Sequence, residues 1–167
     1  MLPIVTLPDD RLFQKSADVT TIDGTLNQFV QDMIKTMIEA DGIGLAAVQV
    51  GSLQRLFVVR IPNEEALVFI NPTILQFSDT TGPYEEGCLS IPGIYSDIIR
   101  PLEINVKAVD LNGSEFTLDA DGLLARVIQH EYDHLNGTLF YQLLKPRQQE
   151  RFLRVYERER GAETSTL

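Results

Sequence analysis

The two histidines of this chain, the only ones in its 167 residues, lie four positions apart in the segment His130-Glu131-Tyr132-Asp133-His134. This spacing is close to one helical turn, so a helix presents both imidazoles on one face, where they can bind one metal ion. Glu131 lies about 100° further round the helix, where its carboxylate can take a proton from a bound water. In a chain of this composition the pattern arises by chance roughly once in a thousand. The alternative, two structural histidines on a buried helix, leaves Glu131 in the interior at a high cost.

A metal bound by two histidines, with water in a fourth position, needs one more ligand from the protein. The only cysteine, Cys88, lies upstream in Glu86-Gly87-Cys88-Leu89-Ser90. Taken alone, such a cysteine is more often a small buried hydrophobe, but beside a metal it binds as a thiolate. A zincin-type protease instead takes its third ligand from residues after the second histidine. The candidates there are Glu150, Glu157, Glu159 and Glu163.

Hydrophobic periodicity predicts three helices. The first carries one apolar stripe, made of Leu26, Phe29, Val30, Met33, Ile34, Met37 and Ile38. The first helix is expected to start after Asp23 or Thr25 and to end at Asp41-Gly42. The second is expected from about Gly122 to Leu135, with a stop at Asn136-Gly137. The third is expected to begin near Pro146 and to end by Gly161. The second of these helices carries both histidines.

Short β-branched or alternating runs predict strands, which are expected at residues 55–60, 67–70, 73–77 and 102–109. Asn112-Gly113 is typical of a hairpin turn after the last of them. The connections are too short for several parallel crossovers. We therefore expect an α+β fold with mostly antiparallel sheets around the central helix that bears the histidines, and with an N-terminal and a C-terminal helix.

Composition narrows the class of protein further. We expect residues 1–167 to form a single domain, because no repeat or linker-like stretch divides the chain. No run approaches the ~18 apolar residues of a membrane span, and the first residues do not resemble a secretory signal. A single cysteine fits a reducing cytoplasm. A net charge of −10 argues against binding to DNA. The exception is residues 145–160, with six Lys and Arg against three Glu.

Three segments resemble, in order and spacing, the signature motifs of the bacterial peptide deformylase family. They are GIGLAAVQ at 42–49, EGCLS at 86–90 and QHEYDH at 129–134. The resemblance covers about residues 4–145. It implies a cytoplasmic hydrolase that removes the N-formyl group from the initiator methionine of nascent polypeptides and releases formate. The first segment lacks the preceding strand and third glycine of a dinucleotide-binding loop, so nucleotide binding is rejected.

The resemblance also implies the metal and the chemistry of the site. Cys88, His130 and His134 are expected to bind one divalent ion, Fe²⁺ in the family, with Zn²⁺, Ni²⁺ or Co²⁺ able to replace it. Water bound to the metal is expected to attack the formyl carbon, with Glu131 as the general base. The same carboxyl group then returns the proton to the leaving amine.

Other roles are carried over from the resemblance alone. Gln49 and the backbone N–H of Leu89 are expected to bind the oxyanion. Ile43 and Gly44 are expected to pair with the substrate backbone as an added strand. The remaining substrate-binding positions are expected to be Gly87, Tyr84, Tyr95, Leu123, Arg126 and Val127.

Three of these positions depart from the family's pattern. Tyr84 stands where the family often has Ile, Tyr95 where it often has Arg, and Arg126 where an apolar residue often lines the methionine pocket. We expect a pocket that is narrower or more polar. The hypothesis is an enzyme with altered efficiency or altered preference around the N-terminal methionine.

Two questions stay open at this level. The basic helix at 145–161 is either an ordinary solvated helix that packs through Phe152, Val155 and Tyr156, or a contact with the ribosome. Besides a zincin-type protease, a non-catalytic metal-binding or peptide-binding module also explains the ligands. A monomer is the favoured oligomeric state.

Overall fold

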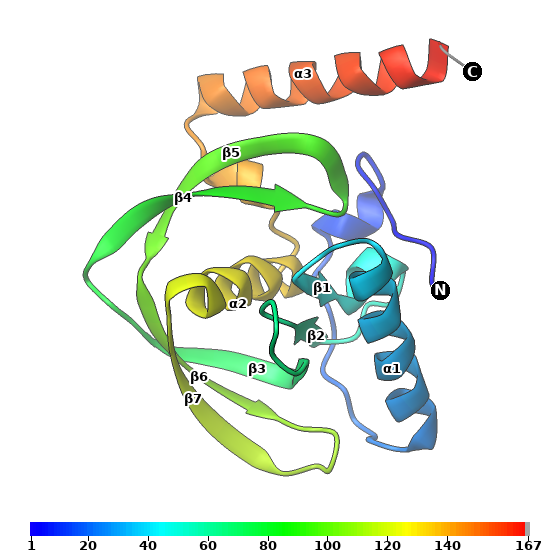
Figure 1. Cartoon of the computed structure of the whole chain (residues 1–167), viewed down its shortest axis with the longest axis vertical. Helices are drawn as coiled ribbons and strands as arrows, with labels where there is room; N and C mark the ends of the chain where they lie inside the picture. Colours follow the sequence, from blue (N-terminus) through cyan, green and yellow to red (C-terminus); the bar gives the residue numbers. More distant parts are fainter. Residues whose placement is uncertain (166–167) are drawn as a thin grey trace.

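A computed structural model describes the backbone of residues 1–165 and the side chains of residues 1–160. Two antiparallel sheets lie on either side of one central helix, α2 (Gly122–Leu135), as Figure 1 shows. Two more helices, α1 (Gly24–Glu39) and α3 (Pro146–Ser165), pack on the outside of this arrangement. The α+β class predicted from the sequence is confirmed, and so is the central position of the helix with both histidines.

The larger sheet has five antiparallel strands in the order β1-β2-β3-β6-β7. Their bounds are β1 Gly44–Ala46, β2 Leu56–Val59, β3 Leu67–Phe77, β6 Glu103–Val109 and β7 Glu115–Asp121. The smaller sheet pairs only β4 (Thr81–Cys88) with β5 (Ile91–Pro101). Three 3₁₀ turns complete the described chain, namely η1 Asp10–Phe13, η2 Ala47–Val50 and η3 Phe140–Leu143. Strand β1 is an edge strand, because β2 is its only partner.

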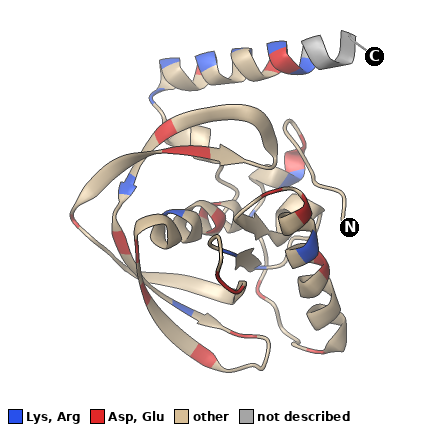
Figure 2. Ribbon diagram, in the orientation of Figure 1, with Lys and Arg blue, Asp and Glu red and all other residues tan. Residues whose placement is uncertain are grey.

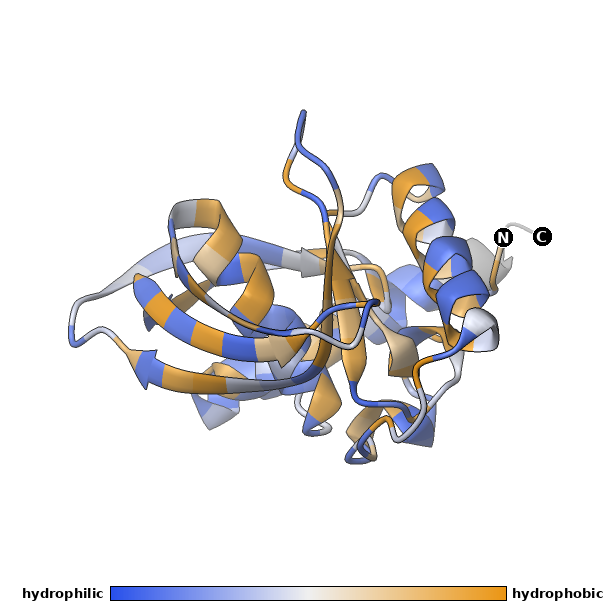
Figure 3. Ribbon diagram, turned by 90° about the horizontal axis from the view of Figure 1, so that it is seen from below, coloured by the Kyte–Doolittle hydropathy of each residue, from blue (hydrophilic) through white to orange (hydrophobic). Residues whose placement is uncertain are grey.

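The main core lies between α2 and the larger sheet. Apolar residues alternate with polar ones along several strands (Figure 3), so one face of the sheet is buried against the helix. Phe57 and Phe69 stack on neighbouring strands with ring centroids 4.9 Å apart. This packing buries α2 deeply enough that polar side chains on its inner face are shielded from water.

Helix α1 follows the predicted stripe closely. The side chain of Asp23 caps the helix by accepting a hydrogen bond from the N–H of Leu26 at 2.9 Å. The helix ends at Glu39, and Asp41 then adopts a left-handed φ of 58°. Ile38, the last residue of the predicted stripe, is 42% exposed, whereas the preceding Met37 is fully buried.

Strand β3 joins two segments that were predicted separately on either side of Asn71-Pro72. Its register with β6 shifts between Ile70 and Thr73, and such a bulge accommodates the proline within a strand. Asn71 takes the left-handed conformation there, and its side chain exchanges two hydrogen bonds with the backbone of Val19. The break predicted at this point was therefore wrong.

The sheet β4–β5 has no counterpart among the predicted strands. Glycine, proline and consecutive acids in β4 hide its strand character from a search for β-branched runs. Its long pairing with β5, from Thr81 opposite Pro101 to Cys88 opposite Ile91, supplies the missing hydrogen bonds. Pairing between strands, rather than local preference, makes this segment extended.

Helix α3 begins at Pro146 as predicted and continues to Ser165, beyond the predicted end at Gly161. It packs through Phe152 and Tyr156, both buried. Lys and Arg residues recur along this helix (Figure 2). None of the helices in the described residues is long and apolar enough to cross a membrane.

Candidate functional site

The three predicted metal ligands converge between α2 and the end of β4. One ligand atom from each of Cys88, His130 and His134 lies within 4.8 Å of the others. Sγ of Cys88 is 3.3 Å from Nε2 of His134, and both histidines are buried. The register of β4 with β5 shifts between Glu86 and Cys88, a bulge that redirects the strand as it reaches the helix.

This cluster fits a divalent metal ion better than it fits a set of hydrogen bonds. A single thiol can donate only one hydrogen, so it cannot satisfy two imidazoles. Nδ1 of His134 has no partner among the described residues. Burial lowers the pKa of His134 well below its usual value, which keeps the ring neutral, the form that binds metals. Although burial opposes the shift, hydrogen bonds to Cys88 and Glu86 raise the pKa of His130 well above its usual value, so binding a metal would release a proton from this ring. A thiolate with the two rings then neutral is a donor set that suits Fe²⁺ or Zn²⁺.

Glu131 is 3% exposed and lies beside the ligands, and its Oε1 has no hydrogen-bond partner among the described residues. Burial raises the pKa of this carboxyl group to about 7, although the neighbouring His130 opposes the shift. A group with this pKa can both accept and donate a proton near neutral pH.

Close packing around the site requires glycine at two positions. A Cβ at Gly44 would lie 2.5 Å from Oε2 of Glu131 and 2.8 Å from a methyl carbon of Val127. A Cβ at Gly87 would lie 2.4 Å from the ring of Tyr95. Real side-chain atoms do not approach so closely. The two glycines therefore allow backbone to line the site where any side chain would displace a neighbour.

Gln49 is buried in η2, directly across from the cysteine. Its amide nitrogen donates to Oγ of Ser90 at 3.1 Å and lies 3.5 Å from Sγ of Cys88. Its Oε1 accepts a hydrogen bond from the N–H of Ala46 at 2.9 Å, which fixes the orientation of the amide. Leu89 follows the cysteine and borders the same cavity. The two residues expected to bind the oxyanion thus line the same cavity as Cys88.

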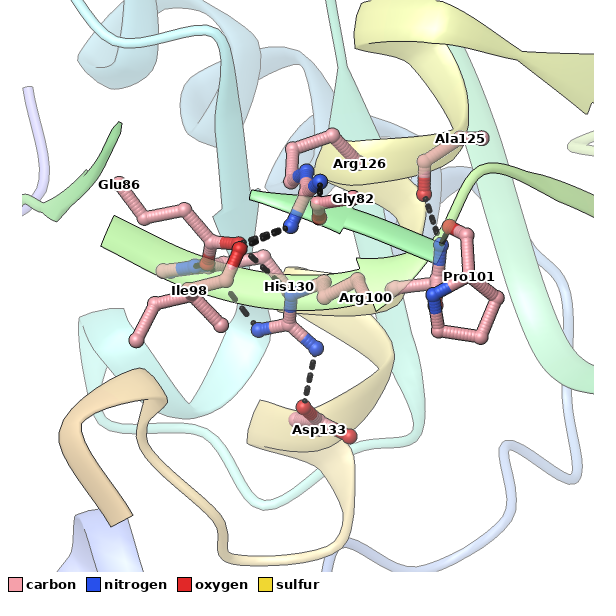
Figure 4. A network of polar contacts seen from close by, with 10 residues as sticks. Gly82, Glu86, Ile98, Arg100, Pro101, Ala125, Arg126, His130 and Asp133 are labelled. Carbon is pink, nitrogen blue, oxygen red and sulfur yellow. Dashed lines mark hydrogen bonds and ion pairs between the residues drawn. The ribbon is translucent and has the colours of Figure 1, made fainter. Parts of the chain in front are cut away.

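Glu86 forms a hydrogen bond with the ring of His130 (Figure 4). Its Oε1 accepts from Nδ1 of His130 at 2.9 Å, and both of its oxygens accept from Arg100, at 2.7 and 3.1 Å. Burial alone would raise the pKa of Glu86, but the hydrogen bonds from His130 and Arg100 lower it to about 2. Arg100 also donates to Asp133 at 2.8 Å. An ionised Glu86 orients the ring and leaves its other nitrogen directed to the metal position.

A pocket of about 410 Å³ opens beside this cluster. All the substrate-binding positions predicted from the sequence line it, namely Ile43, Gly44, Tyr84, Gly87, Tyr95, Leu123, Arg126 and Val127. The predicted catalytic residues Gln49, Leu89 and Glu131 line it too, as do the predicted ligands Cys88 and His130. His134 does not border the pocket and lies on the buried side of the cluster. The fold therefore brings residues from every predicted motif to one cavity.

Arg100 is the principal residue of the site that sequence reasoning missed. It is 4% exposed, yet it lies in a strand that was not predicted, directly before a proline. An arginine at such a position carries no local signal of burial. The protease alternative expected a third ligand after His134, but in the cluster of candidate ligands among the described residues the third member is Cys88. Of the candidate acids, Glu163 lies outside the residues whose side chains are described.

Known proteins resemble the chain over nearly its whole length. The sequence model of the family described as Polypeptide deformylase matches residues 1–150. A peptide deformylase of Chromohalobacter salexigens is 43% identical over 163 residues, which is 96% of each chain. One of Chromobacterium violaceum is 49% identical over 153 residues, 90% of this chain and 91% of the relative.

Solved structures agree with these relatives. A crystal structure of a peptide deformylase from Legionella pneumophila superposes with a TM-score of 0.92 at 38% identity, over 98% of both chains. A peptide deformylase from Synechococcus elongatus in complex with actinonin gives a TM-score of 0.87 at 44% identity, covering 91% of this chain and 85% of that one.

Proposed function

The chain belongs to the polypeptide deformylase family and is a metal-dependent hydrolase that removes the N-formyl group of nascent polypeptides, and from this premise we propose how its residues act. The observation that carries the proposal is the convergence of Cys88, His130 and His134 beside Glu131 in one pocket. We assign the three as ligands of one divalent ion. Fe²⁺ is the expected ion, and Zn²⁺, Ni²⁺ or Co²⁺ can take its place because the same donors suit each of them.

When bound there, the ion would polarise the formyl carbonyl and bring the pKa of a water close to neutrality. Glu131 acts as the general base that removes a proton from the attacking water. It then delivers that proton to the amine as the bond between formyl carbon and nitrogen breaks. Its burial supports this role, because a pKa of about 7 serves both transfers.

Gln49 and the backbone N–H of Leu89 are proposed to stabilise the negative charge on the formyl oxygen. The position of the Gln49 amide nitrogen, 3.5 Å from the Cys88 sulfur, supports the assignment. The hydrogen bond from the N–H of Ala46 fixes the Gln49 amide before substrate arrives. Removal of one such donor typically costs about 3 kcal/mol of barrier.

Strand β1 is proposed to bind the peptide backbone as an added strand. The carbonyl of Ile43 already accepts a hydrogen bond from the N–H of Arg60, at 2.9 Å. Successive residues of a strand direct their N–H and C=O groups to opposite sides, so those of Gly44 face the open edge. An extended formylated peptide paired there would place its first residue in the pocket. The remaining lining positions, Gly87, Tyr84, Tyr95, Leu123, Arg126 and Val127, would surround its side chain.

Three broader assignments complete the proposal. Residues 1–167 form a single catalytic domain, with the basic helix at 145–161 as part of it. The protein acts as a monomer in the cytoplasm, where formylated nascent chains are made.

The cationic face of α3 is assigned to a contact with the ribosome. Its exposed Arg147, Arg151 and Arg154, on a chain of net charge −10, support this assignment. Unchanged ribosome binding after deletion of 145–167 would contradict the last assignment.

The decisive experiment measures formate released from a formyl-Met-Ala-Ser peptide by Ni²⁺-loaded protein. A Glu131→Gln variant is the control, because it keeps the shape of the side chain and removes its ability to accept the proton. We expect kcat to fall between about 10² and 10⁴-fold with bound metal unchanged. Equal rates in the two proteins would remove Glu131 from its proposed role. Cleavage of casein instead of formate release would favour the protease alternative.

A further inference from the structure

Arg126 places a buried cation at one end of the substrate pocket. The residue is 7% exposed and lines the pocket from α2, four positions before His130. Its Nη1 donates to the carbonyl of Ile98 at 2.8 Å and to Oε2 of Glu86 at 3.2 Å, and its Nη2 donates to the carbonyl of Gly82 at 2.8 Å. Figure 4 shows this guanidinium held between the helix and the two strands. Its position is therefore fixed before any substrate binds.

These contacts leave part of the guanidinium without a partner. The group carries five N–H bonds, and the three acceptors account for only three of them. The hydrogen bonds of the described residues include none from its Nε and no second one from its Nη2, and no Arg126 nitrogen is buried without a partner. A side chain that displaces water from a pocket-lining donor costs free energy unless it supplies an acceptor, so a ligand with an acceptor at this point gains an advantage over one without.

Apolar side chains flank Arg126 on its own helix. Leu123 and Val127 line the pocket there, and the Tyr84 ring lies 5.7 Å from the Arg126 Cζ. A side chain that enters between them meets hydrocarbon on the helix side and hydrogen-bond donors at Arg126. Such a site discriminates strongly against an analogue that lacks the matching acceptor, because its buried donors then stay unpaired.

The local charges indicate which kind of acceptor fits. The charge of Arg126 is already paired with Oε2 of Glu86, at 3.2 Å, and Glu86 also pairs with Arg100 and with Nδ1 of His130. An anionic side chain at Arg126 would therefore lie close to the Glu86 carboxylate, which repels it. A neutral acceptor avoids this repulsion and the cost of burying another negative charge.

We propose that Arg126, with Tyr84, determines specificity by selecting an N-formylated residue whose side chain carries a neutral hydrogen-bond acceptor, as the sulfoxide of oxidised methionine does. The inference rests on the proposed position of the formyl group beside Glu131, since only then does the first side chain extend toward Arg126. The sulfoxide converts an apolar thioether into a strong acceptor at almost unchanged length. Methionine itself offers a weak acceptor, and norleucine offers none.

The first test uses the native protein alone. Formate release is followed from three peptides, formyl-norleucine-Ala-Ser, formyl-Met-Ala-Ser and formyl-methionine sulfoxide-Ala-Ser, with Ni²⁺-loaded enzyme. We expect kcat/KM for the sulfoxide to exceed that for norleucine at least about tenfold, with methionine between them. A norleucine peptide that reacts as well as the sulfoxide would overturn the inference. No formate from any of the three would instead overturn the proposed function.

The second test removes the donors. Arg126→Met keeps an unbranched side chain and deletes every N–H, so we expect the order of the three peptides to reverse. The control is Lys35→Met, which removes an exposed cation from α1 and should leave the order as it is. An unchanged order in active Arg126→Met protein would assign the preference elsewhere. If that variant does not fold, the comparison of peptides in the native protein still decides the question.

Discussion

Helix α2 and the sheet β4–β5 together build the candidate metal site, but they are stabilised in different ways. The helix lies between the two sheets, and its Ile128 and Leu135 are completely buried. Among the described strands, β4 and β5 pair only with each other. An isolated two-stranded sheet is marginally stable in water. The proposed ligand Cys88 therefore lies on the element with less stability of its own.

Polar links from α2 compensate for this difference. Asp133 binds Arg100 of β5 at 2.8 Å, and Gln129 donates to the carbonyl of Pro101 at 2.9 Å. Arg126 donates to carbonyls on both strands. The helix therefore serves as a rigid template, and these side-chain hydrogen bonds position the sheet β4–β5 against it. We infer that the geometry of the third ligand depends on these links and on the metal.

Loss of the third ligand should have the largest effect. In Cys88→Ala the two imidazoles of α2 remain, but two protein ligands bind a metal poorly, so we expect bound metal and formate release to fall to background. Metal per chain is measured by elemental analysis. Glu131→Gln is the matched control, expected to be inactive with its metal retained. One metal per chain in active Cys88→Ala protein would exclude the cysteine as a ligand.

Removal of the central link should cost stability next. Arg100→Met leaves Asp133 without its cation and weakens the set of charges around Glu86, so unfolding free energy should fall by about 3–5 kcal/mol. Urea unfolding measures it. Lys107→Met is the control, because that residue forms a pair with Glu115 in which both side chains are about half exposed; its loss should cost less than about 1 kcal/mol. Equal losses in the two variants would contradict the template role of α2.

A smaller change tests the contact between β1 and α2. In Gly44→Ala the new methyl group displaces Glu131, and we expect kcat to fall up to about 100-fold with metal content unchanged. Gly24→Ala is the control, since a Cβ there meets nothing within 4 Å. Wild-type turnover by Gly44→Ala protein would show that Glu131 needs no fixed position.

Removal of the metal should have the smallest effect, and we expect it to affect β4–β5 more than α2. After chelation we expect amide hydrogens of β4 near Cys88 to exchange at least about tenfold faster, because one restraint on the strand is gone. Amides in the middle of α2 should keep their protection. Hydrogen exchange with mass spectrometry of peptic fragments compares the regions directly. Equal acceleration in both would show that the metal stabilises the fold as a whole.

The difference between α2 and β4–β5 also explains how well each could be predicted. The helix has an apolar period and a stop at Asn136-Gly137, so the predicted bounds and the observed ones agree. The strands β4 and β5 lack such local signals, and no sequence pattern there indicates that Arg100 is buried. The predicted break at Asn71-Pro72 was wrong because a bulge absorbs the proline.

The sequence by itself determined the family and the central helix, and it named the three side chains that converge as a possible metal site, because four-residue spacing and rare residue types carry that information locally. Only the tertiary structure decided that Glu86, Arg100 and Asp133 join into one network behind His130. It alone places the guanidinium of Arg126 against the carbonyls of Gly82 and Ile98. Such contacts join residues far apart in the chain, and their energy comes from shared burial, which no short segment contains.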